Sequence, residues 1–164
     1  MIQDFCAYTT IEQPCEILQV IKKSKFYGRL FPAQTPEEAQ AVLDACKKQY
    51  WDASHNCSAY VIGGAGLIMA LHDAGITMND IEPQGTAGVP MLEALKKSGL
   101  TNVLAVVTRY FGGTLLGAGG LVRAYTSSVS EAVKAAQKIC FQPMDRFRIV
   151  FPFPLCGRAE AALR

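Results

Sequence analysis

The sequence predicts an α+β fold, in which a β-sheet packs against helices within one main domain. Segments rich in β-branched residues alternate along the chain with segments whose apolar residues recur at helical spacing. The chain has 164 residues, of which 50% are hydrophobic, so it is long enough to enclose a substantial core. One stretch, residues 103–125, contains a strand pattern, a glycine-rich loop and a helix pattern in succession.

The composition argues against several classes of protein. The net charge of +2 permits contact with nucleic acid but does not demand it. The cysteines show no zinc-type spacing, and no basic-then-apolar signal sequence begins the chain, so we expect reduced thiols, a cytoplasmic location, no metal and no cofactor. The longest apolar run, residues 59–71, contains glycines and is too short to span a bilayer, so no membrane association is expected.

Two strands are expected near the N-terminus, over residues 8–18 and 25–31, with Pro14 at an edge or a bend. The connection between these strands carries Lys22, Lys23 and Lys25. A solvated turn is the commoner role for such a cationic connection. The functional alternative is a patch that faces phosphate groups.

A helix is predicted from Thr35 to about Tyr50, because a capping residue is followed by proline and two acids. Trp51, just after this helix, is expected to pack against the sheet. The next strand pair is predicted over residues 55–62 and near residues 67–71. His55 and Cys57 share one face of their strand, but together they define neither a metal site nor a nucleophilic dyad, so a structural role is favoured for His55.

A loop over residues 73–84 contains Asp80 and Glu82, which could bind Mg²⁺ or act as an acid and a base. Turn formation and helix capping are the commoner roles of such acids. The following segment starts a second helix with a glycine-rich sequence that contains Gly85, Thr86 and Gly88. Gly99 suits the end of that helix.

The next strand is predicted over residues 102–110, and a long helix is predicted to reach about Lys138. The loop between them contains five glycines: Gly112, Gly113, Gly117, Gly119 and Gly120. A helix start favours anions, and the flanking Arg109 and Arg123 could add charge-assisted hydrogen bonds to a phosphate or carboxylate. Tight turning and close packing explain the glycines about equally well. Neither standard phosphate-binding fingerprint is present.

Residues 146–153 are expected to form a strand and residues 155–164 to start a helix. One strand and one short helix cannot bury a core alone. We therefore divide the chain into a domain over residues 1–140 and an incomplete second domain, or a tail that docks elsewhere, over residues 141–164. The exposed phenylalanines of the second segment would favour a homodimer.

Four segments occur in the order typical of the YigZ/IMPACT family and resemble its sequence signature: residues 22–26, 53–60, 82–88 and 108–125. The resemblance covers about residues 8 to 138. It implies a two-layer α/β domain of the ribosomal-protein domain-2-like type, with a mixed sheet of about five or six strands, three helices and a left-handed βαβ crossover. Residues 141–164 resemble the start of the ferredoxin-like second domain of bacterial members.

The resemblance also implies a function. Eukaryotic members regulate translation through protein partners, and bacterial members are suspected of binding nucleic acid or the translation machinery. No catalytic residue is assigned in the family. This chain has Asn79 and Ile81 where the family usually has an acid and a glycine, which weakens a metal or acid–base role for that loop.

We therefore expect a non-catalytic binding module linked to the regulation of translation, with RNA, the ribosome or a translation-associated protein as its partner. The expected anion- or nucleic-acid-binding residues are Lys22, Lys25, His55, Arg109, Gly112, Gly113, Gly117, Gly119, Gly120 and Arg123. A second glycine-rich helix start would contribute Glu82, Gly85, Thr86 and Gly88. The alternative is an enzyme or binder acting on a phosphorylated small molecule or nucleotide, by analogy with the GHMP kinases, which share the implied fold.

Overall fold

The computed structural model describes residues 7–63, 68–75, 85–150 and 152–162. Its main feature is a five-stranded sheet with the strand order β2-β3-β6-β4-β5, in which all four neighbouring pairs are antiparallel. The strands are β2 (Cys15–Ile21), β3 (Ser24–Pro32), β4 (His55–Ile62), β5 (Ile68–Gly75) and β6 (Val103–Tyr110). Because β3 and β4 both run antiparallel to β6, which lies between them, they run parallel to each other.

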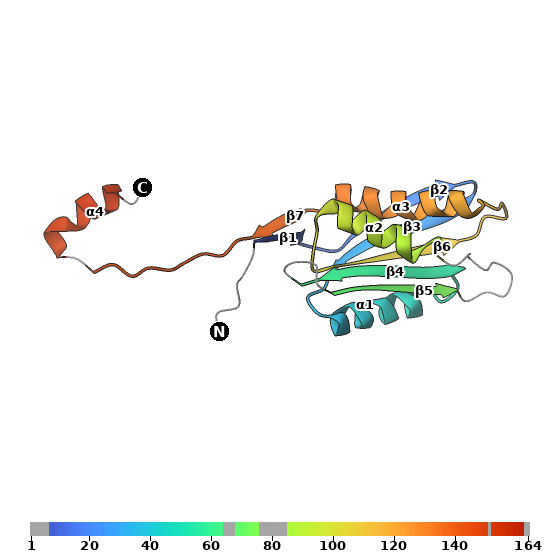
Figure 1. Ribbon diagram of the computed structural model, residues 1–164, viewed down its shortest axis with the longest axis horizontal. Coiled ribbons are helices and arrows are strands. Elements are labelled where there is room, and N and C mark those ends of the chain that lie inside the picture. The colour runs from blue at the N-terminus through green and yellow to red at the C-terminus, as the bar shows by residue number, and fades with distance from the viewer. Residues whose placement is uncertain (1–6, 64–67, 76–84, 151, 163–164) are drawn as a thin grey trace.

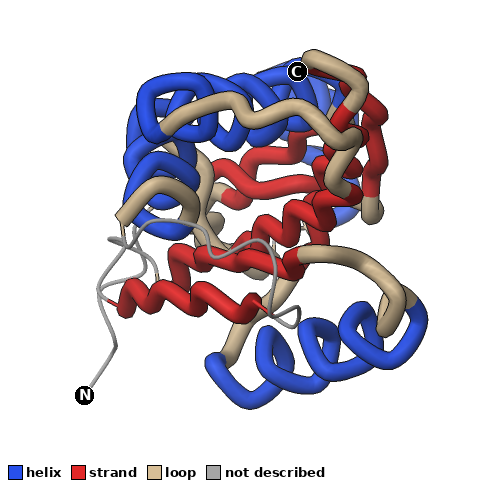
Figure 2. Tube along the Cα trace, turned by 90° about the vertical axis from the view of Figure 1, so that its right-hand side faces the viewer, coloured by secondary structure: helices blue, strands red, loops and turns tan. Residues whose placement is uncertain are grey.

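Helices cover both faces of this sheet (Figures 1 and 2). Helices α2 (Gly88–Ser98) and α3 (Ala118–Ala135) share one hydrophobic core with the sheet, and α1 (Pro36–Gln49) forms a second core on the opposite face. Strand β4 is buried along its whole length and β6 nearly so, since both lie between the two helical layers. This explains why these two strands lack the alternation of apolar and polar residues that a half-exposed strand shows.

The helix ends follow the expected local chemistry. The Thr35 side chain accepts a hydrogen bond from the Glu38 backbone N–H at the start of α1. Helix α2 ends at Gly99, whose φ of 70° lies in the left-handed region. Both predicted helices and the α+β class are therefore confirmed.

The single strand predicted over residues 8–18 is replaced in the structure by two strands. Strand β1 (Tyr8–Ile11) ends before Pro14, and β2 begins after it. Strand β1 pairs with β7 (Lys138–Phe141) in a separate two-stranded sheet. The prediction that α3 reaches Lys138 was wrong: the helix ends at Ala135, and the next residues pair with β1.

Four further expectations need correction. The sheet is antiparallel rather than mixed in its neighbouring pairs, and helices cover two faces rather than one. The strand predicted near residues 67–71 extends to Gly75. Trp51 does not pack on the sheet, since 74% of its surface is exposed. The handedness of the β3–α1–β4 connection stays a prediction.

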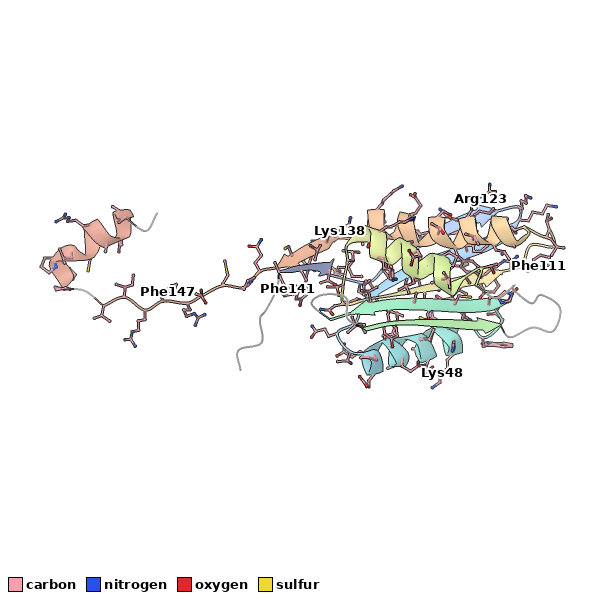
Figure 3. All side chains as sticks on the ribbon, viewed as in Figure 1. Lys48, Phe111, Arg123, Lys138, Phe141 and Phe147 are labelled. Carbon is pink, nitrogen blue, oxygen red and sulfur yellow. The ribbon has the colours of Figure 1, made fainter. Side chains whose placement is uncertain are left out.

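The C-terminal segment extends away from the domain in Figure 1. Residues 146–150 form no strand, because no neighbouring strand supplies hydrogen bonds to them, and Phe147 is 81% exposed (Figure 3). A short 3₁₀ turn, η1 (Phe153–Leu155), precedes helix α4 (Cys156–Ala162), so the predicted helix is confirmed. The division of the chain at residue 140 and dimerisation through residues 141–164 stay predictions.

Candidate functional site

The glycine-rich loop packs closely against the turn between β2 and β3. A Cβ atom placed on Gly112 would lie 2.1 Å from the carbonyl carbon of Lys23. The Gly112 N–H donates a hydrogen bond of 3.2 Å to the Ser24 hydroxyl. Gly113 and Gly117 have φ values of 81° and 74°, which other residues rarely adopt. These three glycines therefore support the packing and turning interpretation.

The two glycines in the first turn of α3 are less constrained. A Cβ on Gly119 would have its nearest neighbour 3.9 Å away, at the Arg123 side chain. A Cβ on Gly120 would lie 3.0 Å from the Leu116 side chain. Among the described residues, no side chain accepts a hydrogen bond from the first backbone N–H groups of α3.

A cavity of about 380 Å³ opens beside this helix start, and we call it the α3-start cavity. It is lined by Ile21, Lys22, Leu116, Gly120, Arg123, Ala124 and Ser127. Lys22 comes from the β2–β3 turn, where it and Lys23 have φ values of 46° and 68°, as in a type I′ hairpin turn. A hydrogen bond of 2.8 Å from the Ser127 hydroxyl to the Gln19 side chain ties α3 to β2. The fold thus brings Lys22 and Arg123 together at the glycine-rich start of α3.

Arg109 and His55 lie elsewhere, inside the domain. They are paired residues of β6 and β4, and each is only 1% exposed. The Arg109 guanidinium carbon lies 5.6 Å from the centres of both the Phe26 and the Phe111 rings. Neither side chain reaches the surface, so the expectation that Arg109 and His55 contact an external anion needs correction. The structural role favoured for His55 agrees with its burial beside Cys57, which lies in the core under α2 and α3.

Lys25 faces the opposite side of the sheet from the α3-start cavity. It lines a cavity of about 460 Å³ on the α1 side, together with Glu16, Lys23, Tyr27, Arg29, Tyr50, Asp52, Tyr110 and Phe111. Tyr27 and Arg29 were not among the residues predicted from the sequence to form a site. Their alternation with Lys25 along the predicted strand was the available signal, because residues at positions i, i+2 and i+4 of a strand share one face.

The described residues of the second glycine-rich helix start form a turn and a buried contact. Gly85 has a φ of 82°, Thr86 is 6% exposed, and Gly88 is buried as the first residue of α2. The predicted Glu82, like Asp80, lies outside the described residues. Thr86 and Gly88 therefore do not present a surface for a large partner.

The described parts of the chain contain neither a candidate metal site nor a candidate membrane span. No group of three or more His, Cys, Asp or Glu side chains there could hold a metal ion. None of the helices there is both long and apolar enough to cross a membrane.

Comparison with known proteins identifies the family. The Impact N-terminal domain matches residues 22–133. The chain is 53% identical over 158 residues to the IMPACT family member YvyE of Bacillus subtilis (strain 168), covering 96% of this chain and 70% of that protein. It is 41% identical over 150 residues to the IMPACT family member YigZ of Escherichia coli (strain K12), covering 92% and 72%.

A solved structure agrees with this assignment. The crystal structure of a hypothetical protein matches with a TM-score of 0.75 and 36% sequence identity, covering 84% of this chain and 65% of that chain. The present chain thus spans a little under two thirds of the solved chain and about seven tenths of the two bacterial relatives. On these matches, the chain belongs to the IMPACT family.

Proposed function

We propose that this protein is a non-enzymatic binding module linked to the regulation of translation, and that it binds RNA, alone or in the ribosome, at the α3-start cavity. Family membership supports the link to translation, since the sequence resemblance implies that eukaryotic members regulate translation. The observation that carries the binding site is the convergence of Lys22 and Arg123 on the start of α3. Both side chains are exposed.

The chemistry of the α3-start cavity suits a phosphate group. Its described lining residues include two cations and no carboxylate, so they would attract an anion without a competing negative charge. The unpaired N–H groups and partial positive charge of a helix start add to this attraction. The apolar Ile21 and Leu116 beside the cations offer contact for a sugar or base. Such binding depends on phosphate contacts, which release counterions from the nucleic acid. The affinity therefore falls as the salt concentration rises, because added salt reduces the free energy gained by that release.

The test is a titration of short single- and double-stranded RNA at two salt concentrations. We compare wild type with Arg123→Ala and Lys22→Ala, and we use Lys97→Ala as the matched control, because Lys97 is an exposed lysine near the end of α2. Each test variant should weaken binding and reduce the salt dependence by about one phosphate contact. The control should bind like wild type.

Two results would contradict this proposal. RNA binding that is absent at low salt would remove the nucleic-acid function and leave a translation-associated protein as the partner to seek. RNA binding that neither variant alters would place the site elsewhere. Binding of a phosphorylated small molecule in preference to RNA at this cavity would support the alternative based on the GHMP kinases instead.

A further inference from the structure

The sheet face on the α1 side is only partly covered. Helix α1 forms its core with residues of β4 and β6, and it leaves the edge strand β2 and the start of β3 open. Leu18 and Val20 of β2 are accordingly 51% and 61% exposed. The cavity of about 460 Å³ lies on this face near the C-terminal end of α1, and we call it the Arg29 cavity. Its volume lies within the range that small-molecule sites commonly have.

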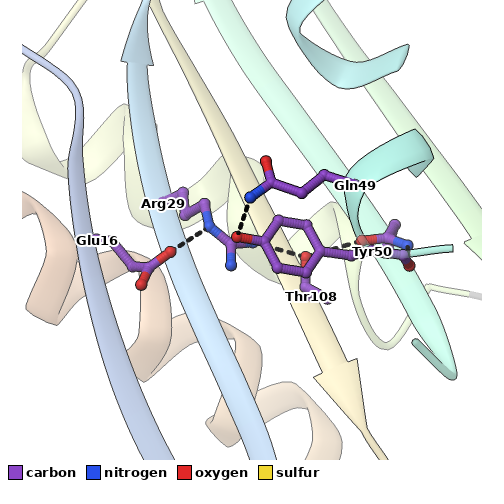
Figure 4. A network of polar contacts seen from close by, with 6 residues as sticks. Glu16, Arg29, Gln49, Tyr50 and Thr108 are labelled. Atoms are coloured by element: carbon purple, nitrogen blue, oxygen red, sulfur yellow. Dashed lines mark hydrogen bonds and ion pairs between the residues drawn. The ribbon is translucent and has the colours of Figure 1, made fainter. Parts of the chain in front are cut away.

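Arg29 lies in the wall of this cavity and is only 5% exposed. Its Nε forms an ion pair with Glu16, and its Nη1 donates a hydrogen bond of 2.8 Å to the Thr108 hydroxyl (Figure 4). The Thr108 hydroxyl in turn donates to the Asn56 side chain over 2.8 Å. The guanidinium is therefore held in one orientation by groups from three strands.

The remaining guanidinium nitrogen has no such partner. Arg29 Nη2 is buried and forms no hydrogen bond with any residue that the structure describes. A buried donor without an acceptor is unfavourable, and native proteins contain few of them. The Tyr50 ring covers the guanidinium at 3.9 Å from its centre. Glu16, Arg29 and Tyr50 also line a neighbouring cavity of about 410 Å³, so Arg29 borders both cavities. A ligand can reach the buried Nη2 only if the Tyr50 ring moves aside.

Aromatic rings form the rest of the wall. The rings of Tyr27 and Tyr110 meet edge to face at 6.0 Å, and Phe111 is 38% exposed beside them. The Tyr110 hydroxyl donates a hydrogen bond of 3.0 Å to the Asp52 carboxylate. Trp51, the sole tryptophan of the chain, lies between two lining residues in sequence. Exposed aromatic faces of this kind bind bases by stacking.

The charge at the rim favours an anionic ligand. Lys23 and Lys25 are both exposed and line the cavity, and the ion pair with Glu16 already compensates the charge of Arg29. The two lysines together outweigh the single Asp52 carboxylate. A phosphate group could therefore bind at the rim while a planar group enters among the rings.

We propose that the Arg29 cavity binds a nucleoside monophosphate unit. The base contacts Tyr27, Tyr110 and Phe111, an acceptor atom of the nucleoside takes the hydrogen bond of Arg29 Nη2, and the phosphate binds Lys23 and Lys25. A simple anion would leave the aromatic wall unused, and an apolar ligand would leave Nη2 unpaired. The unit could be a free mononucleotide or one nucleotide of a single strand. This site lies on the other face of the sheet from the α3-start cavity, so it does not depend on the function proposed there.

The test measures binding of four probes by calorimetry and by the fluorescence of Trp51. The probes are guanosine 5′-monophosphate, guanosine, ribose 5-phosphate and a short single-stranded oligoribonucleotide. We expect the monophosphate to bind at least about tenfold more tightly than guanosine or ribose 5-phosphate, because only the complete unit contacts both the rings and the lysines. A stronger response to the oligoribonucleotide than to the mononucleotide would identify a strand as the source.

Substitutions in the wall and at the rim test each contact of the nucleotide separately. Arg29→Lys keeps a cation beside Glu16 but removes the Nη2 donor, while Lys25→Ala and Phe111→Ala change exposed residues. Each should weaken binding of the mononucleotide at least about fivefold. The matched control is Lys48→Ala, an exposed lysine of α1 that lines neither cavity (Figure 3).

Three results would overturn the proposal. The first is that neither the mononucleotide nor the oligoribonucleotide binds. The second is that ribose 5-phosphate binds as tightly as the mononucleotide, which would show an anion site without a base. The third is that Lys25→Ala and Phe111→Ala, both folded by circular dichroism, bind like wild type.

Discussion

Replacing Gly112 with alanine should destabilise the domain strongly. The new Cβ would lie 2.1 Å and 2.2 Å from the carbonyl carbon and oxygen of Lys23, and 2.5 Å from the Ser24 nitrogen. These are backbone atoms, so no rotation of a side chain relieves the overlap. Either the glycine-rich loop or the β2–β3 turn must move. Overpacking typically costs 1–3 kcal/mol, and we expect about 3 kcal/mol here because the obstacle is backbone.

Two matched substitutions in the same loop isolate the cause. Gly119→Ala makes the same chemical change in the first turn of α3, where the nearest atom is 3.9 Å away, and should stabilise by up to about 0.5 kcal/mol. Gly117→Ala meets no neighbour, but the φ of 74° and ψ of 163° at that position belong to a region that is essentially restricted to glycine. We expect a loss of about 1–3 kcal/mol from backbone strain alone.

The assay is thermal and urea denaturation of wild type and the three variants. A loss of about 3 kcal/mol corresponds to a fall in Tm of roughly 10 °C for a chain of this size. The decisive comparison is between Gly112→Ala and Gly119→Ala. Equal stability of these two variants would refute the inference that the loop packs against the β2–β3 turn.

Two other predictions concern single side chains. Thr35→Ala should lower the free energy of unfolding by about 1 kcal/mol, because the side chain caps α1, and urea denaturation against Thr35→Ser as control measures it. Burial, followed by the hydrogen bond to the Asp52 carboxylate, raises the pKa of Tyr110 to about 12. The unfolded state releases this proton near pH 10, so Tyr110 should reduce stability as the pH rises from about 10 to 12. Absorbance titration should show a late step from Tyr110, which Tyr110→Phe should remove; an unchanged titration curve of that variant would contradict the assignment.

Local patterns in the sequence were sufficient for several elements. The cap, proline and acids at the start of α1 were recognisable because they act within one helical turn. The apolar, β-branched start of β6 was recognisable because strands buried on both faces are rich in such residues. The end of α3 was misplaced because pairing of residues 138–141 with β1, over 120 residues away in sequence, overrides a helical pattern.

For the candidate sites, too, some features follow from the sequence alone and others only from the tertiary structure. The sequence by itself determined the family, the α+β class and the concentration of glycines and cations around residues 109–123, since these follow from residue identity and short-range spacing. Only the tertiary structure decided which cations lie near one another: Lys22 lies with Arg123, Lys25 lies with Arg29 on the other face, and Arg109 is buried. The physical reason is that neighbouring positions of a strand point to opposite faces, and helices arriving from distant parts of the chain determine which of those faces remains open.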